Sequence, residues 1–300
     1  MHILITGGTG LIGRALCRRL LQRDHRLTVL SRQPPERVAA LCGGAVTALA
    51  RLRDLTPEAR FNAVVNLAGE PIAARRWTAE RKKVLWDSRV TLTAELVDFI
   101  AAAETRPAVL ISGSAVGYYG NRGDLPLSED SPASDATGDR LCAAWEEAAQ
   151  RAADHGVRVC RLRTGLVIGP GGGFLQRMLP PFRLGLGGPI GDGRQWMSWI
   201  HRDDHLSLTE LLLEQGALSG AFNATAPNPV TNAEFSRCLA RLLRRPALLP
   251  VPAPLLRLVF GEMAELLLGG QRVLPQRLLG AGFRFRFPQL DQALADVLGS

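Results

Sequence analysis

Short apolar runs alternate with longer segments of helical periodicity along residues 1–224 of this chain. The apolar runs have the length of buried strands, and the segments between them repeat their apolar positions about every three to four residues. The predicted strands cover residues 2–5, 27–32, 63–67, 108–112, 157–163 and 221–224, and the clearest helices cover residues 78–103 and 137–155. Such alternation is typical of a parallel sheet with helices on both faces. We therefore expect an α/β protein built on a doubly wound, Rossmann-type parallel sheet.

A glycine-rich turn follows the first predicted strand. Gly7, Gly10 and Gly13 are spaced as G-x-x-G-x-x-G directly before a helical pattern. Gly7 permits a tight turn, Gly10 lets the backbone approach a pyrophosphate, and Gly13 lets the helix pack close to the strand. The free N–H groups of the helix N-terminus then face the anion. Strand, turn and helix together predict a dinucleotide-binding site.

The end of the second predicted strand indicates which dinucleotide is bound. Enzymes that select NAD place an Asp or Glu there to hold the ribose 2′-hydroxyl, whereas an Arg accommodates a 2′-phosphate. This chain has Ser31 and Arg32 at that point, and no acidic residue lies between Leu27 and Glu36. Guanidinium can bind a phosphate through two hydrogen bonds. The pattern predicts NADP(H), with Arg32 binding the phosphate and Ser31 supporting it; a solvated surface arginine is the alternative.

The carboxyl ends of later strands supply further candidate residues. Ligands of parallel α/β sheets bind at this edge. Residues 66–69, 112–114 and 163–165 all lie there. The backbone from Asn66 to Gly69 can contact the adenine ribose, and Ser112 ends the next strand. A buried arginine at a strand end, such as Arg163, indicates an anion or a carboxylate partner.

The pattern changes after Gly165. Glycine-rich loops at 169–173 and 185–193 favour a lobe that covers a ligand, and Thr231 with Glu234 predicts a capped helix. The remaining predictions are a proline-rich linker at 246–254, an apolar helical face at 255–267, a strand at 283–287 and a helix at 290–298. We expect residues 1–245 to form the NADP-binding domain, with lobe insertions at about 166–217. Residues 246–300 should form a small C-terminal domain, part of a smaller α/β substrate lobe.

Composition and charge limit the kinds of molecule that this protein is expected to bind. The net charge of +8 is carried almost wholly by arginine, because Lys82 and Lys83 are the only lysines, and no single basic stripe is evident. This favours a small anionic ligand over nucleic acid. The five cysteines include no C-x-x-C pair, which predicts reduced thiols and no metal site. A strand that starts at residue 2 leaves no room for a signal peptide, and no apolar run reaches membrane-spanning length. We expect a cytoplasmic protein that does not insert in membranes.

Several motifs resemble those of one enzyme family. The chain resembles an extended short-chain dehydrogenase/reductase, of the atypical, epimerase-like type with a small extra C-terminal domain. The resemblance rests on the glycine turn and on residues 66–69, 76–77, 87–89, 112–120, 145–146, 163–165, 197–201 and 282–285. It implies contact with the cofactor by Gly7, Thr9, Gly10, Leu11, Ile12, Ser31, Arg32, Leu67, Ala68, Arg89 and Arg163.

Only some of the catalytic residues of that family are present in this chain. Active short-chain reductases use a Tyr-x-x-x-Lys pair and a serine that orients the substrate oxygen. Ser114 matches the serine. The pair is missing, because the only tyrosines are Tyr118 and Tyr119 and both lysines precede them. Counting back from Trp145, Gly138 and Cys142 occupy the expected positions, and Cys142 has the character of a buried thiol.

Two other groups could supply a proton. A tyrosine without a lysine neighbour is protonated at neutral pH, so Tyr118 or Tyr119 could donate to a developing alkoxide, which favours reduction by NADPH. Aromatic packing under the loop is the alternative. His201 titrates near neutral pH and precedes Asp203 and Asp204, although its segment could instead attach the lobe to the sheet.

Two functions remain in competition. The first is an NADP(H)-dependent oxidoreductase or epimerase-like enzyme acting on a small carbonyl or sugar-nucleotide substrate. The second is a non-catalytic NADP(H)-binding sensor or partner protein, which the missing Tyr–Lys pair favours. The sequence leaves the substrate and the oligomeric state open.

Overall fold

A seven-stranded parallel sheet lies at the centre of the described chain. The computed structural model describes residues 1–73, 75–134 and 140–299. Within these ranges the sheet has the order β11-β7-β5-β4-β1-β2-β3, and all its neighbouring strands are parallel. Its strands are β1 (His2–Thr6), β2 (Arg26–Leu30), β3 (Thr47–Leu49), β4 (Ala63–Asn66), β5 (Val109–Ala115), β7 (Arg158–Thr164) and β11 (Gly220–Ala224).

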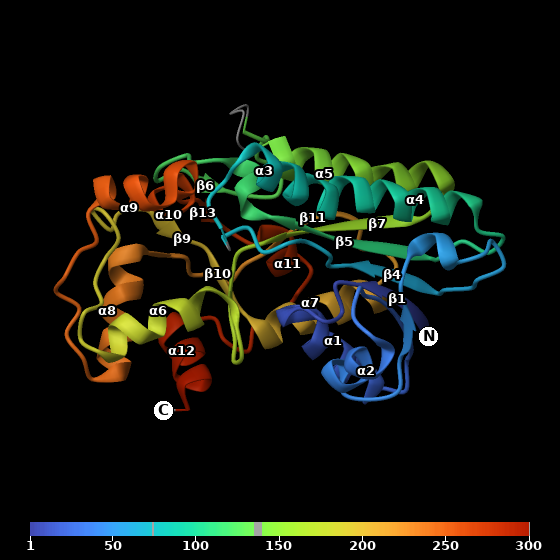
Figure 1. The fold of residues 1–300 in the computed structure, drawn as a ribbon, viewed down its shortest axis with the longest axis horizontal. Helices are drawn as coiled ribbons and strands as arrows, with labels where there is room; N and C mark the ends of the chain where they lie inside the picture. The colour runs from blue at the N-terminus through green and yellow to red at the C-terminus, as the bar shows by residue number, and fades with distance from the viewer. Residues whose placement is uncertain (74, 135–139, 300) are drawn as a thin grey trace.

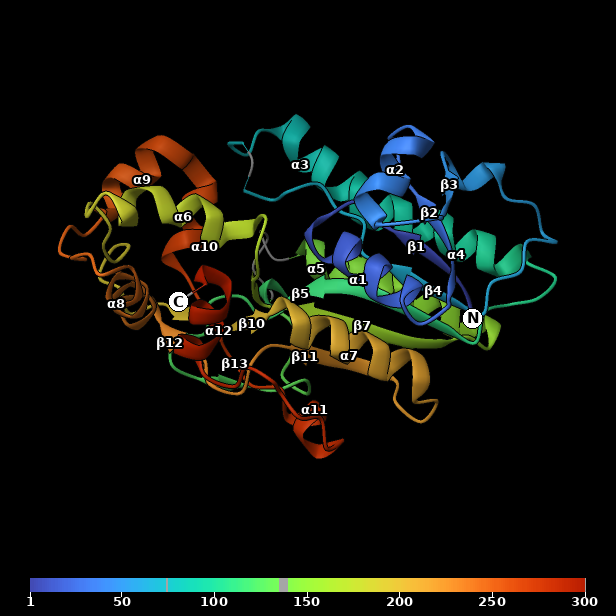
Figure 2. The same cartoon turned by 90° about the horizontal axis from the view of Figure 1, so that it is seen from below.

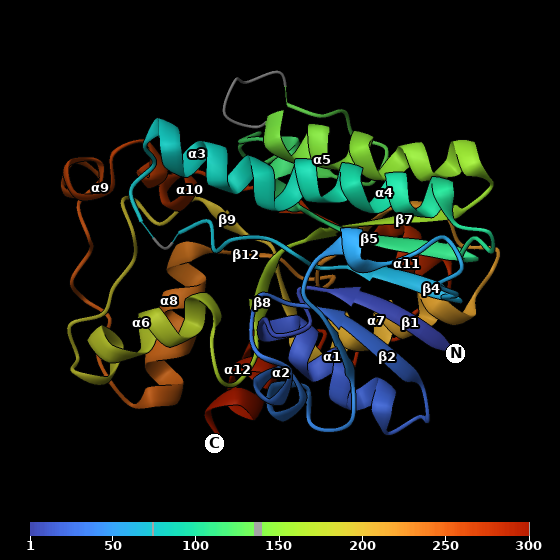
Figure 3. The ribbon, with the colours of Figure 1, turned by 45° about the vertical axis from the view of Figure 1, so that its right-hand side comes forward.

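Helices cover both faces of this sheet (Figure 1). One face carries α1 (Leu11–Leu21), α2 (Pro35–Cys42) and α7 (Arg202–Glu214). The other carries α4 (Leu92–Ala102) and α5 (Arg140–Gln150), and α3 (Ala79–Trp86) extends from α4 on the same side (Figure 3). The doubly wound fold is therefore confirmed. The single helix expected at 78–103 contains a π-helical turn, Asp87–Thr91, between α3 and α4.

The side chains of β1 show why the chain forms this architecture. Ile3 and Ile5 point to one face and pack in a cluster with Leu16 of α1. Leu4 points to the opposite face and packs with Leu96 of α4. All three β1 side chains are fully buried. A strand that is covered on both faces needs a continuous apolar run, and residues 3–5 provide it.

A lobe lies beyond the carboxyl ends of the strands (Figure 2). Its strands are β8 (Leu166–Ile168), β9 (Trp196–Met197), β10 (Trp199–His201) and β12 (Val230–Thr231), and its helices are α6 (Gly173–Arg183), α8 (Asn232–Leu243), α9 (Ala253–Phe260), α10 (Glu265–Leu268) and α12 (Leu290–Leu298). Trp199, Phe235 and Leu294 form part of its separate apolar core. The expected capping box at Thr231 and Glu234 is present at the start of α8.

The C-terminal segment returns from the lobe to the edge of the sheet. Strand β13 (Arg272–Val273) pairs in parallel with β6 (Pro126–Leu127). Helix α11 (Gln276–Gly280) follows, and Arg277 donates hydrogen bonds to the carbonyl oxygens of Ser219 and Ala221 beside β11. The described part of this segment, residues 246–299, thus contacts both the lobe and the sheet edge.

Two predicted elements differ from the structure. Residues 283–287 do not form a strand, because the backbone N–H groups of Arg286 and Phe287 donate to the Asp204 carboxylate, at 2.7 and 3.0 Å. The apolar face expected at 255–267 is broken after Phe260, and Leu258 on it is 76% exposed.

The helix predicted at 137–155 is described only in part. Residues 137–139 lie outside the described residues, and the helix ends in a 3₁₀ turn at Arg151–His155.

Candidate functional site

The turn after β1 forms a cradle, Gly7–Gly13, that requires glycine. Gly7 has a φ of +69°, in the left-handed region that favours glycine. A Cβ atom on Gly7 would lie 2.4 Å from the Leu67 carbonyl oxygen, and one on Gly13 would lie 2.2 Å from the Gly7 carbonyl oxygen. The Ala68 N–H donates to Thr6 Oγ1 at 3.1 Å. The glycine cradle is therefore packed directly against Leu67 and Ala68, the residues that follow β4.

Helix α1 presents an uncapped N-terminus to the same place. Gly10 is its N-cap residue, and its first turn, which begins at Leu11, contains no acidic residue. Unpaired N–H groups and the helix dipole both favour an anion there. Residues 9–12 are each at least partly exposed. Arg14, one turn along α1, donates a hydrogen bond to the carbonyl oxygen of Gly171 and attaches a glycine-rich loop of the lobe to this helix.

A buried hydrogen-bond network joins the ends of β1 and β4 to the middle of β5. Thr6 Oγ1 donates to Asn66 Oδ1 at 2.6 Å, and Asn66 Nδ2 donates to Thr93 Oγ1 at 2.8 Å and to Ser112 Oγ at 3.2 Å. Trp145 Nε1 also donates to Thr93 Oγ1, at 3.0 Å. Ser112 has no exposed surface. Its hydroxyl lies inside the network, and its expected contact with the cofactor stays a prediction.

Arg32 and Glu70 meet across the end of β1. Arg32 follows β2, Glu70 follows β4, and β1 lies between these two strands in the sheet. Arg32 Nη2 lies 2.7 Å from Glu70 Oε1, with the Arg32 side chain 88% exposed. Ser31 Oγ accepts a hydrogen bond from the Gln33 N–H at 3.2 Å. Arg32 thus lies at the edge where a 2′-phosphate is expected, and its role in binding the phosphate stays a prediction.

Arg89 supports the loop after β4. Its guanidinium lies so close to Gly69 that a Cβ there would come within 2.9 Å of the guanidinium carbon. Arg89 Nη2 donates to the Glu70 carbonyl oxygen at 2.9 Å, and the guanidinium lies 5.4 Å from the centroid of the Trp145 ring. Burial lowers the pKa of Arg89. Contact of Arg89 and Gly69 with a cofactor stays a prediction.

A buried ion pair joins α5 to β7. Arg163 donates to both carboxylate oxygens of Glu146, from Nε at 2.8 Å and from Nη2 at 2.9 Å. The Ser114 hydroxyl donates to Glu146 Oε1 at 2.8 Å. Each of the three residues is at most 4% exposed. A hydroxyl that gives its one proton to a carboxylate can only accept a hydrogen bond from a substrate. The expected donation from Ser114 to a substrate carbonyl is therefore not supported.

Arg163 is occupied by protein groups. Its Nη1 donates to Tyr119 Oη at 2.9 Å and to the Glu129 carbonyl oxygen at 3.0 Å, in addition to the two bonds to Glu146. Its position at a strand end predicted an anion or a carboxylate as its partner. The structure shows a carboxylate, that of Glu146. Arg163 thus joins α5, β7 and the loop at Tyr119, and its expected contact with the cofactor stays a prediction.

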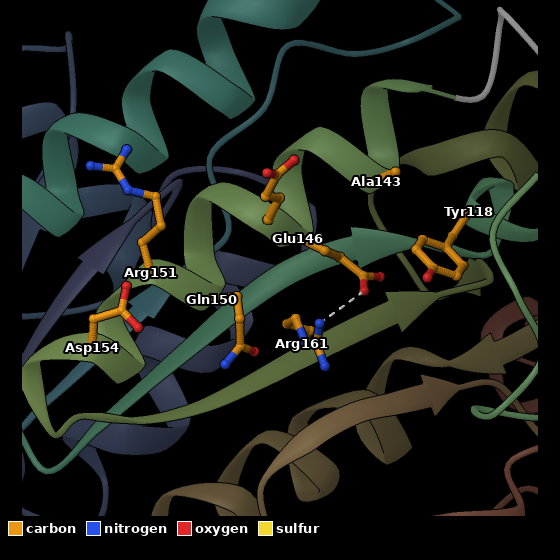
Figure 4. A pocket seen from close by; sticks show the side chains of 8 residues that line it. Tyr118, Ala143, Glu146, Gln150, Arg151, Asp154 and Arg161 are labelled. Atoms are coloured by element: carbon orange, nitrogen blue, oxygen red, sulfur yellow. Dashed lines mark ion pairs between the residues drawn. The ribbon is translucent and has the colours of Figure 1, made fainter. Parts of the chain in front are cut away.

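The two tyrosines differ in environment. Tyr119 is fully buried, its hydroxyl donates to Asn223 Oδ1 at 2.6 Å, and burial raises the pKa of Tyr119 to about 12. Tyr118 is half-buried, and the Arg163 guanidinium carbon lies 3.5 Å from its ring centroid. Tyr118 also lies at the edge of a cavity of about 340 Å³ (Figure 4). Tyr118 is thus the better placed of the two to meet a substrate.

The same cavity reaches Glu146, one partner of the buried ion pair. It is lined by Tyr118, Ala143, Glu146, Glu147, Gln150, Arg151, Asp154 and Arg161. Figure 4 shows the Glu146 carboxylate between Tyr118 and Arg161, and Arg161 Nη1 lies 3.6 Å from Glu146 Oε2. Cys142 lies one turn before Glu146 on α5, whereas Gly138, the other position counted against the missing pair, lies outside the described residues. Glu146 is the ionisable side chain that α5 brings beside Ser114.

His201 acts as a helix cap. It is 1% exposed, and its Nδ1 accepts a hydrogen bond from the Asp203 N–H at 3.2 Å at the start of α7. Burial lowers the pKa of His201, although the charges of Asp203 and Asp296 oppose the shift. A buried neutral imidazole is a poor proton donor. These contacts favour the structural alternative, in which the segment attaches the lobe to the sheet, and the acid role of His201 stays a prediction.

Other candidate chemistry is limited. The five cysteines, all within the described ranges, form no disulfide bond. Across residues 1–73, 75–134 and 140–299, no three His, Cys, Asp or Glu side chains gather where they could share a metal ion. No helix in the described part of the chain combines the length and apolar content needed to cross a bilayer.

The whole N-terminal three-quarters of the chain matches one known family. Residues 3–224 match the NAD dependent epimerase/dehydratase family. The chain belongs to this family. Residues 251–297 match a second family, which is described as a domain of unknown function, DUF1731. The resemblance to epimerase-like short-chain dehydrogenases/reductases is therefore confirmed.

Relatives of this epimerase family member match it over nearly their full length. The epimerase family protein SDR39U1 of Bos taurus is 41% identical over 99% of this chain and 100% of its own. The epimerase family protein Mb2239 of Mycobacterium bovis is 42% identical, over 97% and 96%. The crystal structure of human SDR39U1 with NADPH has a TM-score of 0.91 and 36% identity, covering 100% of both chains.

Sequence reasoning missed two carboxylates of this epimerase family member. Glu70 was not singled out, although it directly follows the Asn66–Gly69 motif at a strand end. Glu146 belongs to the motif at residues 145–146, but its contacts with Ser114 and Arg163 span 32 and 17 residues. A search for acids near strand ends would have found Glu70. Nothing local in the sequence reveals the partners of Glu146.

Proposed function

We propose that this epimerase family protein binds NADP(H) and transfers a hydride to or from a small carbonyl or sugar-nucleotide substrate. The observation that carries the proposal is the glycine cradle, with the uncapped N-terminus of α1 beside it and Arg32 at the end of the neighbouring strand. A pyrophosphate suits the N–H groups of α1, and a 2′-phosphate suits Arg32. The NADPH in the human relative supports the same cofactor.

The residues present fit this cofactor. A Cβ atom at Gly7 or Gly13 would meet backbone atoms within 2.4 Å, so the cradle keeps its backbone free of side chains. At the end of β2, where NAD-selecting enzymes place an acid, the chain has Ser31 and Arg32. When bound, NADPH supplies a hydride, and the protein has to bind the substrate and supply a proton.

We assign the proton donation to Tyr118. Its ring is held on the Arg163 guanidinium, and Arg163 is fixed in turn by Glu146. In this arrangement Tyr118 Oη donates its proton to the alkoxide that develops on the substrate. Ser114 acts as a positioning residue, because its hydrogen bond holds the Glu146 carboxylate in place.

Turnover of NADPH with a panel of carbonyl compounds and sugar nucleotides tests the reaction. Tyr118→Phe should abolish turnover while leaving the NADPH dissociation constant unchanged, because the ring stack on Arg163 is retained. Full turnover in Tyr118→Phe would remove Tyr118 from the mechanism.

A second candidate is a non-catalytic NADP(H)-binding sensor or partner protein. One observation favours it: Ser114, Glu146 and Arg163 satisfy one another in the region where active reductases hold their catalytic groups. NADPH binding without turnover across the whole panel would support this candidate.

The choice of cofactor is tested by calorimetry. NADPH should bind more tightly than NADH, and Arg32→Ala should weaken NADPH binding about tenfold or more, because a hydrogen-bonded charge pair is lost. NADH binding should be little changed. We also propose a cytoplasmic location, which five cysteines without a disulfide bond support. Fractionation of cells that express the chain tests the location.

A further inference from the structure

The loop after β4 places an acid at the point where a 2′-phosphate is expected. Glu70 Oε1 lies 2.7 Å from Arg32 Nη2, across the end of β1. The end of β2, by contrast, carries no acid. The carboxylate that NAD-selecting enzymes hold on the second strand is therefore found here on a different loop, paired with the arginine that should select NADP(H).

Glu70 is held firmly, whereas Arg32 is not. The Glu70 N–H donates to Ser88 Oγ at 3.1 Å, and its carbonyl oxygen accepts from Arg89 Nη2 at 2.9 Å. Its second carboxylate oxygen lies 3.4 Å from Arg81 Nη1, whose side chain is only 13% exposed. The hydrogen bond and charge of Arg32, followed by those of Arg81, hold the pKa of Glu70 below its usual value. Glu70 is thus a fixed anion beside a solvent-exposed guanidinium.

We infer that Glu70 competes with the 2′-phosphate for Arg32 and so limits the preference of this protein for NADP(H) over NAD(H). The inference rests on the proposed function, because it requires Arg32 to bind the phosphate. Carboxylate and phosphate oxygens accept the same guanidinium N–H groups. When the phosphate binds, Arg32 has to leave Glu70 or be shared with it, and the two anions repel each other.

NAD(H) does not encounter this competition. Its ribose carries a 2′-hydroxyl, which needs no arginine and can donate a hydrogen bond to a carboxylate. Glu70 therefore weakens the binding of the phosphorylated cofactor alone. The charge of one loop residue sets the ratio of the two affinities.

Calorimetric titration of full-length Glu70→Gln with NADPH and NADH tests this inference. The amide keeps the size of the side chain and removes its charge. We expect the NADPH dissociation constant to fall about three- to tenfold at low salt, since an exposed ion pair and a nearby repulsion are removed together. NADH binding should change less than about twofold or weaken. The gain should shrink at high salt, and it should be smaller in the Arg32→Ala background, where only the repulsion between Glu70 and the phosphate is left to remove.

A matched control separates this effect from net charge. Glu265 forms an exposed ion pair with Arg257 at 2.8 Å in the lobe, so Glu265→Gln makes the same chemical change elsewhere. It should leave both affinities unchanged. Glu70→Ala is a second variant that removes the same charge if Glu70→Gln folds poorly.

The outcomes are distinguishable. Unchanged or weaker NADPH binding in both Glu70 variants, or an equal gain in Glu265→Gln, overturns the competition. Failure of the wild-type protein to bind NADPH, or an unchanged NADPH affinity in Arg32→Ala, overturns the proposed function and the inference with it.

Discussion

Single residues determine the shape of the glycine cradle. At Gly13 the nearest atoms to an added Cβ are backbone atoms, 2.2 Å away at the Gly7 carbonyl oxygen and 2.7 Å away at the Gly8 Cα. Backbone atoms of a buried turn cannot rotate aside as a side chain can. A methyl group at Gly13 must therefore push α1 away from β1, and the N–H groups that face the anion move with it.

Gly13→Ala is the residue-scale test of this geometry. We expect it to lower the free energy of unfolding by about 1–3 kcal/mol, the usual cost of overpacking, and to weaken NADPH binding strongly. Urea denaturation and calorimetry measure the two effects. Gly216→Ala is the control, because no atom lies within 4 Å of its added Cβ. Unimpaired NADPH binding in Gly13→Ala would show that the cradle does not hold the cofactor.

The roles of single residues could be predicted where one short stretch of sequence contains all the residues involved. The spacing of Gly7, Gly10 and Gly13 and the position of Arg32 after a strand are local patterns. The partner of Arg32 is 38 residues away and could not be inferred from the sequence. For Arg163 the sequence correctly indicated a position near a strand end. Ser112 instead lies in the middle of β5, which continues to Ala115, and only the fold shows that both side chains turn into the protein.

At the scale of elements, a buried ion pair helps to attach α5 to the sheet. Glu146 on α5 and Arg163 on β7 are both 3% exposed and form two hydrogen bonds. Breaking a buried pair by removing one partner leaves an uncompensated charge, and this costs more than removing both partners.

Glu146→Ala should lower the free energy of unfolding by about 3–5 kcal/mol. Arg163→Met combined with Glu146→Ala should cost less than the sum of the two single changes, because no buried charge is left. Denaturation of the four proteins in urea measures this coupling. Glu147→Ala, at the exposed next position of α5, should change stability by no more than about 0.5 kcal/mol. Additive costs for the pair would contradict the coupling.

Strands and helices were predicted well where the spacing of apolar residues is enough to identify them. The predicted strands at 2–5, 63–67 and 221–224 all form. The strand expected at 283–287 does not form, because a carboxylate from α7 takes two of its backbone N–H groups, and a distant partner of this kind leaves no trace in the local alternation. The apolar residues at 255–267 predict one helical face, yet the helix breaks after Phe260 and several of these residues lie on the surface of the lobe.

At the scale of the whole molecule, stability depends on buried histidines. His205 on α7 is fully buried, with Nε2 3.2 Å from Thr164 Oγ1. Burial lowers the pKa of His205 to about 4, from an ordinary value of 6.5 that applies to the unfolded chain. Between these two values the unfolded state binds a proton that the folded state does not, so stability falls as the pH falls.

The free energy of unfolding should therefore decrease from about pH 6.5 downward, with a loss on the order of 2 kcal/mol from His205 by about pH 5. The lowered pKa of His201 acts in the same direction. Urea denaturation across this pH range measures the slope. His205→Gln should reduce the slope, whatever its effect on stability at neutral pH. An unchanged slope in this variant would show that His205 titrates as it does in the unfolded chain.

The pairing of β6 with β13 has a consequence for how the chain is made. The Asn223 N–H donates to one oxygen of Glu129, while the other oxygen accepts from the Arg277 N–H, 148 residues after Glu129. The Asn223 amide in turn donates to the Leu274 carbonyl oxygen. During translation Glu129 and the Asn223 amide stay hydrated until residues 274–277 have left the ribosome. The central strands can assemble earlier, whereas the edge at β11 closes only after these residues have been made.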